Sequence, residues 1–311
     1  MVLSAGALAV VNPFAAGGRA ARLWRQLESA VRAGFPELGV RFTTAPGEAE
    51  AIAHDWGLRN ARGVLLVAGG DGTLHEAVNG LFRSESRAQL GVIPVGSGND
   101  FARNAGIPLD PREALRALQG SPPRSVDLGH LAFQADSGPA ARVFLNSVSL
   151  GVSVHANRLA QSLPRRGAAR LRYGLAGLAA VLWSKPSRYL VTCGDRVLLE
   201  GLALNLTVAN GAYFGGGMRI SPDSSPADGT LELVVLGPLS RLRALQALSQ
   251  LRAGTHLALR EVSVTRLREP LRIASTGPTL RAEADGEEIE VAGGLTIRVL
   301  PAALALLNAP S

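Results

Sequence analysis

The chain contains a single cysteine, Cys193, among its 311 residues. One thiol cannot form a disulfide within the chain, so the sequence excludes a disulfide-stapled secreted scaffold and favours a reducing compartment. It also excludes a zinc site built on a Cys-x-x-Cys pair. Aromatic residues make up only 5% of the chain. This scarcity argues against a nucleic-acid binder, because such proteins stack bases on aromatic rings.

Long apolar runs and lysine are equally scarce. The apolar stretch 173–183 has 11 residues, whereas a helix that spans a membrane needs ~20. The apolar start, residues 1–11, has no basic segment before it, so we expect a buried first strand rather than a signal peptide. Lys185 is the only lysine, and 32 basic against 25 acidic residues give a net charge of +7. This charge favours a polyanionic partner, which could be a nucleic acid, an anionic membrane surface or a phosphorylated substrate.

The length and the 47% hydrophobic content predict two folded domains, at ~150 residues each. In the first part, apolar runs predict strands at 7–11, 64–67 and 90–94, and helical patterns predict helices at 19–32, 73–82 and 111–119. This alternation is typical of a parallel sheet with helices on its faces. After a boundary near residue 125, short strands are predicted at 143–154, 188–199, 202–209, 230–236, 261–267, 271–274, 280–284 and 288–291, with helices at 167–184 and 239–252. The second part therefore predicts an antiparallel sandwich.

The strongest local motif follows the predicted strand at 64–67, where three glycines surround one aspartate. We expect Gly69, Gly70 and Gly72 to adopt positive φ and, with the positive end of the next helix, to form a phosphate cradle. The carboxylate of Asp71 beside phosphates indicates a magnesium ion and hence a nucleoside triphosphate. A plain strand-to-helix turn capped by Asp71 remains the alternative.

Other nucleotide and hydrolase motifs are absent. The chain has no GxxxxGK[ST], no GxGxxG and no HExxH, and we expect His75 on the surface of its helix. A second turn, 94–101, follows the next strand, but Val95 and Asn99 exclude a GxSxG nucleophile elbow. A third turn, 11–19, follows the first strand. Parallel strands end at one sheet edge, so we expect these turns to face one site, although each alone could be only structural.

Taken together, these turns resemble the diacylglycerol kinase catalytic-domain family, and most of all its bacterial lipid kinases. The matching segments are Asn12-Pro13 with Gly17-Gly18, 69–73 with Glu76, 94–103, 146–151, 210–217, Ser221-Pro222, 227–231 and Asp285-Gly286-Glu287. The resemblance implies a Rossmann-like α/β domain of the NAD kinase and phosphofructokinase type, residues 1–125 with a returning segment at about 298–311. It also implies an antiparallel β-sandwich domain for the lipid substrate, residues 126–297.

The resemblance also implies the site residues. The ATP-binding positions would be Asn12, Pro13, Phe14, Ala15, Ala16, Thr43, Gly70, Asp71, Gly72, Thr73, Leu74, His75, Glu76 and Ser97. Asp71 and Asp100 would lie near the phosphates and the metal, Glu287 would be the general base, and Ser225, Asp228 and Thr230 would hold a structural magnesium ion. His75 stands where many relatives carry asparagine, and Ser97 where threonine is common. Without the resemblance, Glu287 could be a solvated hairpin residue and Asp228 part of a simple turn.

The resulting hypothesis is an ATP- and Mg²⁺-dependent lipid kinase, cytoplasmic and peripheral at the inner membrane face. Its partners would be a lipid substrate and an anionic membrane surface, with no nucleic acid, and a homodimer is left open. The acceptor lipid also stays open among diacylglycerol, phosphatidylglycerol and sphingoid or ceramide-like alcohols. The alternatives are an NAD kinase-like enzyme and a catalytically silent lipid-binding regulatory module. The basic, apolar stretch 165–185 predicts a helix that either packs on the sandwich or contacts anionic headgroups.

Overall fold

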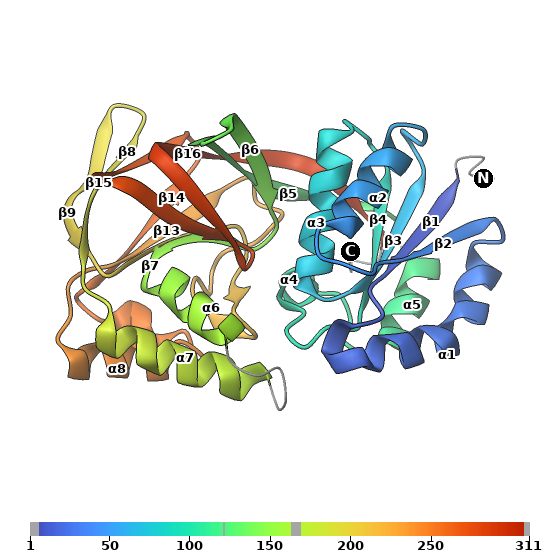
Figure 1. Ribbon diagram of the computed structural model, residues 1–311, viewed down its shortest axis with the longest axis horizontal. Coiled ribbons are helices and arrows are strands. Elements are labelled where there is room, and N and C mark those ends of the chain that lie inside the picture. The colour runs from blue at the N-terminus through green and yellow to red at the C-terminus, as the bar shows by residue number, and fades with distance from the viewer. Residues whose placement is uncertain (1–5, 121, 163–168, 308–311) are drawn as a thin grey trace. The chain divides into compact units, whose positions relative to one another are not determined.

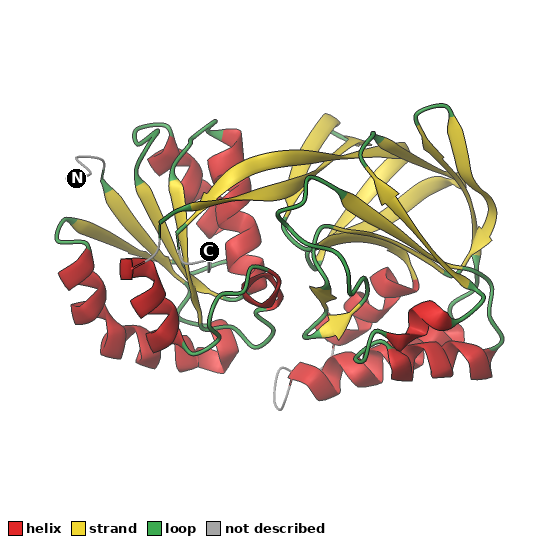
Figure 2. Cartoon of the chain, turned by 180° about the vertical axis from the view of Figure 1, so that it is seen from behind, coloured by secondary structure: helices red, strands yellow, loops and turns green. Residues whose placement is uncertain are grey.

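The structure, a computed structural model, describes residues 6–120, 122–162 and 169–307. The chain divides into two compact units, Met1–Val126 with Ala302–Ser311, and Asp127–Pro301. The first unit is a parallel sheet covered by helices on both faces, and the second is built mainly of antiparallel strands (Figures 1 and 2). The predicted fold class, α/β followed by a β-sandwich, is confirmed.

The sheet of unit 1 contains four parallel strands in the order β4-β3-β1-β2. They are β1 (Ala7–Val11), β2 (Leu38–Phe42), β3 (Val64–Gly69) and β4 (Gln89–Pro94). Every residue of β3 is buried, as expected for a central parallel strand with both faces covered. The end of β16 (Glu287–Leu306) returns to this unit, where Ala305 and Leu306 pair in parallel with β4.

Helices cover both faces of this sheet. On one face α1 (Arg19–Gly34) and α5 (Pro111–Gly120) form a core with the sheet, centred on the fully buried Trp24. α2 (Glu48–Gly57) and α3 (Asp71–Arg83) pack against each other, and α3 also contacts β3. The short helices η1 (Ala15–Gly18) and α4 (Asp100–Asn104) begin in the loops after β1 and β4.

The three predicted strands and three predicted helices of this unit are confirmed, with ends that differ by at most two residues. Strand β2 and helices α2 and α4 were not predicted. β2 is an edge strand with one buried residue, Leu38, and α2 buries only Ala49, Ala53 and Gly57. Neither element therefore carries the large apolar stripe on which the sequence prediction depended.

Unit 2 is an antiparallel sandwich whose larger sheet has the order β14-β13-β10-β7-β15-β16. β8 pairs with β15 and β9, and β5 pairs with β16 and β6. The strands are β5 (Arg124–Ala135), β6 (Gly138–Phe144), β7 (Ser147–Gly151), β8 (Ser187–Cys193), β9 (Arg196–Ala203), β10 (Asn205–Ala209), β13 (Leu231–Leu236), β14 (Val262–Leu267) and β15 (Leu271–Ala284), with a small ribbon of β11 (Tyr213–Phe214) and β12 (Met218–Arg219).

Four of the predicted strands of unit 2 were wrong in extent, and a fifth, 288–291, is only the start of β16. The segment 143–154 contains the end of β6, all of β7 and the start of a helix. The segment 188–199 is a hairpin, because Gly194 turns the chain between β8 and β9 at φ 55°. Segments 271–274 and 280–284 belong to one strand, β15, whose pairing with β16 shifts register between Ala274 and Thr279.

Three helices lie together on one side of the sandwich (Figures 1 and 2). They are α6 (Val152–Ser162), which packs against β7 and β15, α7 (Ala169–Trp183) and α8 (Arg241–Gln250). A short helix η2 (Thr255–Ala258) follows α8. The predicted helix 167–184 corresponds to α7, and its first two residues lie outside the described part of the chain. Over the described ranges, no helix combines the length and the apolar character required to cross a bilayer.

Candidate functional site

Three loops of unit 1 follow the carboxyl ends of β1, β3 and β4 and meet at one edge of the sheet. The adjacent strands β3 and β4 end in register, with Gly69 opposite Pro94, and the N–H of Val95 donates to the carbonyl of Gly69 over 3.1 Å. Just beyond this point a Cβ on Gly96 would lie 2.4 Å from the Cα of Gly70. The two turns therefore touch through their backbones, and the sequence prediction that the turns share one edge is confirmed.

The glycines of the first motif serve a different purpose from the one predicted. Gly69, Gly70 and Gly72 do not adopt positive φ, and Gly70 is extended at φ −102° and ψ −172° before α3 begins at Asp71. Gly69 and Gly70 are needed for close packing, because a Cβ on Gly69 would lie 2.6 Å from the Cβ of Thr73. Gly72 has open space around its missing Cβ, with no atom within 4 Å. Space therefore adjoins the first turn of α3.

Two side chains connect the loops. The Asp71 carboxylate accepts a hydrogen bond of 3.1 Å from the backbone N–H of Phe101, which lies in α4 after β4. The amide of Asn12, after β1, donates 2.9 Å to the hydroxyl of Thr73, and its carbonyl oxygen accepts from the N–H of Phe14 at 3.0 Å. Hydrogen bonds thus connect the predicted nucleotide-binding residues Asn12, Asp71 and Thr73 to neighbouring loops at one edge.

Thr43 joins this edge, because it is buried at the end of β2 and its N–H donates 2.9 Å to the carbonyl of Val11. Ser97 is exposed, and Asp100 is buried as the first residue of α4. The loop after β1 is also exposed at its tip, where Phe14 is 67% exposed. Pro13, Ala15 and Ala16 are partly buried in the same loop, and Ala16 has φ 51°.

Three of the predicted nucleotide contacts have side chains turned into the protein. Leu74 is part of the core, and His75 is only 5% exposed, so the prediction of a surface histidine was wrong. The ring of His75 lies 3.3 Å from the amide nitrogen of Asn79, one turn further along α3. Glu76 accepts a 3.1 Å hydrogen bond from the N–H of Ala49 in the first turn of α2. The side chains of residues 74–76 therefore pack within unit 1 and support the loop, and they are not placed to contact a nucleotide directly.

These observations fit a nucleotide phosphate chain with a divalent cation. The first N–H groups of α3 have no partner within the helix, and the helix dipole favours an anion there. The open space beside Gly72 adjoins these groups, and it stays open because glycine has no side chain. Asp71 and Asp100 add two carboxyl groups at the same edge, which suit Mg²⁺ bound to phosphates.

In unit 2, the Asp285-Gly286-Glu287 turn between β15 and β16 is held by several hydrogen bonds. The Asp285 carboxylate accepts from the N–H groups of Leu145, Asn146 and Ser147 at 2.7, 2.8 and 3.1 Å. Asp285 and Gly286 have φ of 48° and 94°. The hairpin turn predicted from Asp-Gly is therefore confirmed, and the three donors, two just before β7 and one at its first residue, fix it in place.

The same turn is fixed from the side of α6. The buried Asn157 donates a 2.7 Å hydrogen bond to the carbonyl of Gly286. The N–H of Gly286 donates to the carboxyl of Glu283, whose pKa is raised to about 8 by burial and by the nearby Asp285 carboxylate. Glu287 follows this fixed backbone, and its side chain is exposed.

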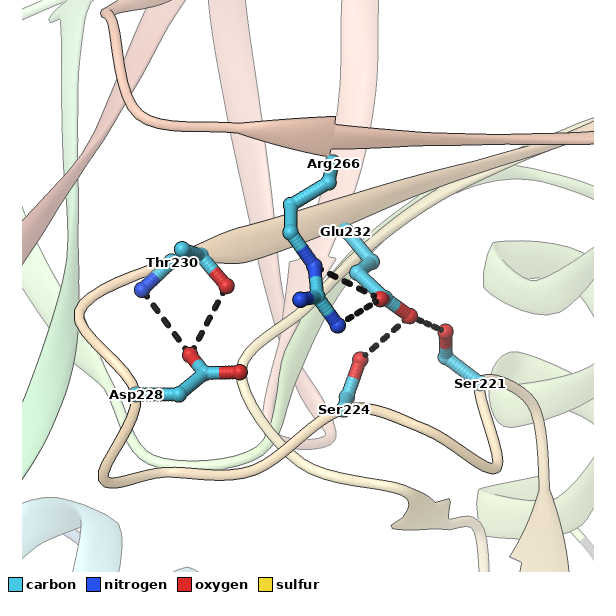
Figure 3. A network of polar contacts seen from close by, with 6 residues as sticks. All are labelled: Ser221, Ser224, Asp228, Thr230, Glu232 and Arg266. Atoms are coloured by element: carbon cyan, nitrogen blue, oxygen red, sulfur yellow. Dashed lines mark hydrogen bonds and ion pairs between the residues drawn. The ribbon is translucent and has the colours of Figure 1, made fainter.

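A second polar cluster surrounds the loop predicted to hold magnesium (Figure 3). One carboxylate oxygen of the exposed Asp228 accepts from the N–H and the hydroxyl of Thr230 at 3.0 and 2.7 Å. This turn leaves the second carboxylate oxygen and backbone carbonyls as the hard ligands that Mg²⁺ prefers. Asp228 thus fits a single-carboxylate ion site, together with the carbonyls of the exposed Ser225 and of Thr230. The described ranges contain no cluster of three or more His, Cys, Asp or Glu side chains suited to a metal.

Beside this loop, the buried Glu232 binds three side chains (Figure 3). It accepts from the hydroxyls of Ser221 and Ser224, the latter at 2.9 Å, and from the guanidinium of Arg266 at 3.0 Å. Burial opposes ionisation of Glu232, but the two hydroxyls and Arg266 outweigh it and lower the pKa of the carboxyl group.

Asp127 is a residue of this region that the sequence analysis missed. It is buried at the start of the second unit. Its carboxylate accepts a hydrogen bond of 2.7 Å from the N–H of Gly229, and its own N–H donates a hydrogen bond of 2.7 Å to the carbonyl of Pro226. Both bonds hold the 225–230 loop from a position about 100 residues earlier in the chain. No local pattern around Asp127 signals this partner.

A helix-covered parallel sheet with glycine turns at its carboxyl edge, followed by an antiparallel sandwich, defines the fold that diacylglycerol kinases share with NAD kinases. The family model for the diacylglycerol kinase catalytic domain matches residues 6–131. The model for the YegS C-terminal NAD kinase beta sandwich-like domain matches residues 146–308, more than half of the chain. The chain therefore belongs to the diacylglycerol kinase catalytic-domain family, in its branch of YegS-like bacterial lipid kinases.

Curated relatives agree with this assignment. A Pseudomonas aeruginosa protein named "Probable lipid kinase YegS-like" is 33% identical over 298 residues, which are 92% of each chain. A Stenotrophomonas maltophilia protein of the same name is 34% identical over 82% of this chain and 81% of its own. These relatives support the assignment of the chain to the lipid kinase family.

Solved structures agree on the fold. A diacylglycerol kinase from Bacillus anthracis covers 100% of this chain and 99% of its own with a TM-score of 0.74 at 21% identity. An NAD kinase from Archaeoglobus fulgidus covers 97% of this chain and 94% of its own with a lower TM-score, 0.53, at 14% identity. NAD kinases are therefore distant neighbours in fold.

Proposed function

We propose that this lipid kinase transfers the γ-phosphoryl group of ATP to a lipid hydroxyl, with Mg²⁺ as cofactor and Glu287 as general base. The observation that carries the proposal is the hydrogen-bonded support of the Asp285-Gly286-Glu287 turn, described above. A general base must be held in position to accept a proton along a defined direction. A solvated hairpin glutamate would need no such support.

In this reaction the lipid oxygen forms a bond to the γ-phosphorus while the bond from that phosphorus to ADP breaks. The hydroxyl proton passes to the carboxylate of Glu287, which orients the oxygen for in-line attack. Bound Mg²⁺ would neutralise phosphate charge. Asp71 and Asp100 would hold this ion, and the N–H groups at the start of α3 would bind phosphate oxygens. Asp228, with the carbonyls of Ser225 and Thr230, would bind a structural Mg²⁺.

The acceptor classes remain diacylglycerol, phosphatidylglycerol and sphingoid or ceramide-like alcohols. We further propose a peripheral location on an anionic membrane surface, where such lipids reside, in the cytoplasm. No observation favours a nucleic acid as partner. The oligomeric state does not enter the proposal.

The test is phosphate incorporation from labelled ATP into a panel of these lipids, with Glu287→Gln as variant and Glu290→Gln as matched control. Glu290 is an exposed glutamate of the same hairpin, paired with Arg281 at 2.7 Å. We expect Glu287→Gln to lower the rate by about 100-fold or more and Glu290→Gln to leave it unchanged. Equal background rates for the wild type and Glu287→Gln would instead favour a silent lipid-binding module. Phosphorylation of added NAD would favour an NAD kinase.

A further inference from the structure

The three helices on one side of unit 2 come from segments without acidic residues. Residues 137–194 contain no Asp or Glu, although the chain has 25 in all, and they carry eight basic residues. Residues 233–260 also lack Asp and Glu and carry four arginines. These segments supply α6, α7 and α8. The helices on this side therefore carry basic residues and no acidic ones, and the acidic groups that pair with Arg158 and Arg243, those of Glu288 and Glu261, come from other elements.

Helix α7 is apolar on its outer side as well as its inner side. Ala176, Ala180 and Val181 are buried against the unit, whereas Leu175 is 53% exposed, Leu178 40% and Trp183 76%. No charged residue occurs between positions 173 and 184. A helix that is apolar all round is normally covered on every side. The described structure covers only one side of α7.

The start of α8 extends this exposed surface. A Cβ on Gly177 of α7 would lie 3.4 Å from Leu248 of α8, and Ala244 packs in one cluster with Ala180 and Val181. The two helices are therefore antiparallel, and the first turn of α8 lies beside the end of α7. In that first turn Leu242 is 81% exposed and follows the exposed Arg241. The end of α7 is followed by the exposed Lys185.

We propose that this surface, named here the docking face and consisting of Leu175, Leu178, Trp183 and Leu242, inserts into an anionic lipid bilayer. The proposal rests on the proposed function in one respect, that the acceptor is a membrane lipid. Leucine and tryptophan side chains bury apolar area in the acyl and headgroup boundary, where tryptophan is enriched. The acid-free helices and their basic neighbours complement anionic headgroups. A protein partner would need acidic groups of its own, whereas the bilayer supplies both an apolar layer and negative charge.

The test measures binding of the full chain to vesicles of phosphatidylglycerol and phosphatidylcholine in equal parts, by co-sedimentation and by the emission of tryptophan. Trp24 is buried and Trp56 partly buried in unit 1, so the part of the blue shift that is lost in Trp183→Ala reports on Trp183. The variant is Leu175→Glu with Leu178→Glu. The matched control is Leu58→Glu, at a leucine that is 63% exposed in unit 1.

We expect the double variant to bind at least about tenfold more weakly, since two leucines no longer bury apolar area. Leu58→Glu should bind like the wild type. Binding should also weaken at high salt and on pure phosphatidylcholine. Equal binding by the double variant, or no binding by the wild type, would overturn the docking face. Turnover of a short-chain lipid analogue dispersed without vesicles tests the kinase proposal separately, because it requires no docking.

Should the double variant lose its thermal transition, Trp183→Ala provides a second test, because a side chain that is 76% exposed contributes little to folding. The expected result is again weaker binding to anionic vesicles. Unchanged binding by a folded Trp183→Ala, together with no blue shift of the wild type, would also overturn the proposal.

Discussion

Gly72 and Gly96 lie at the sheet edge where we propose that nucleotide binds. Alanine at these two positions should shift the melting temperature in opposite directions, and alanine at Gly72 should also weaken nucleotide binding. A Cβ on Gly96 would lie 2.4 Å from the Cα of Gly70 and 2.7 Å from the side-chain oxygen of Asn99. The obstacle is backbone, which cannot rotate away, so one of the two turns must move. A Cβ on Gly72 would meet nothing within 4 Å, and its position lies in the first turn of a regular helix.

The magnitudes follow from these contacts. Overpacking of a tight site costs about 1–3 kcal/mol, so Gly96→Ala should lower the melting temperature by about 2–12 °C. Replacing a helical glycine by alanine stabilises by roughly 0.5–1 kcal/mol, so Gly72→Ala should raise the melting temperature by about 1–4 °C. However, its methyl group enters the space we assign to phosphate oxygens. Nucleotide affinity should therefore fall at least about tenfold, equivalent to about 1.4 kcal/mol.

Differential scanning fluorimetry and titration calorimetry with Mg²⁺-ATP would measure both properties on the same samples. The decisive result is a variant, Gly72→Ala, that is more stable than the wild type but binds nucleotide more weakly. If Gly72→Ala binds Mg²⁺-ATP as the wild type does, phosphates do not occupy the start of α3. If Gly96→Ala melts like the wild type, the close approach of the two turns is wrong.

Three further predictions concern unit 2. The pKa of Glu283 is about 8 in the folded chain, against 4.5 ordinarily. The free energy of unfolding should therefore fall between pH 4.5 and pH 8, by up to about 1.4 kcal/mol per pH unit. Glu283→Gln should flatten that decline in urea titrations. The pKa of Glu232 is lowered, so its stabilisation is present at neutral pH and is lost as the pH falls below 4.5. Glu232→Gln should lower the melting temperature at pH 7 and weaken its acid dependence. Asp285→Ala leaves three N–H donors without their acceptor, so the melting temperature should fall, at about 1–3 kcal/mol for each buried donor, and Asp285→Asn should restore part of it.

Strands β1, β3 and β4 of unit 1 could be predicted because buried parallel strands are continuous apolar runs, as in β3 and β4. The glycine motif after β3 also gave the position of the candidate site. The conformation of its glycines could not be predicted, because the need for glycine at 70 arises from Gly96, a residue on another turn. A single sequence shows where a glycine occurs, but it does not show which distant atom occupies the space that a Cβ would need.

The missed helix α2 is a second case in which a distant partner decides the local structure. Helix α3 packs against α2 so closely that a Cβ on Gly80 would lie 2.3 Å from the carbonyl oxygen of Glu50. Because α2 buries small residues and lacks an apolar stripe, the sequence did not predict the helix that covers α3. The prediction that His75 is exposed was also wrong, because the pattern within a helix does not show which elements lie beside it.

The Asp-Gly-Glu turn separates what local sequence can and cannot predict. Asp-Gly signals a hairpin, because both residues tolerate positive φ, and the structure has φ 48° and 94° there. The acceptor role of Asp285 depends on residues 145–147, about 140 positions earlier. These bonds engage the carboxylate of Asp285, whereas the other carboxyl group of the turn, that of Glu287, is exposed. The proposed role of Glu287 as general base requires a carboxylate on a supported backbone, and Asp285 supplies that support. Loss of Asp285 should therefore reduce turnover even where Glu287 is retained.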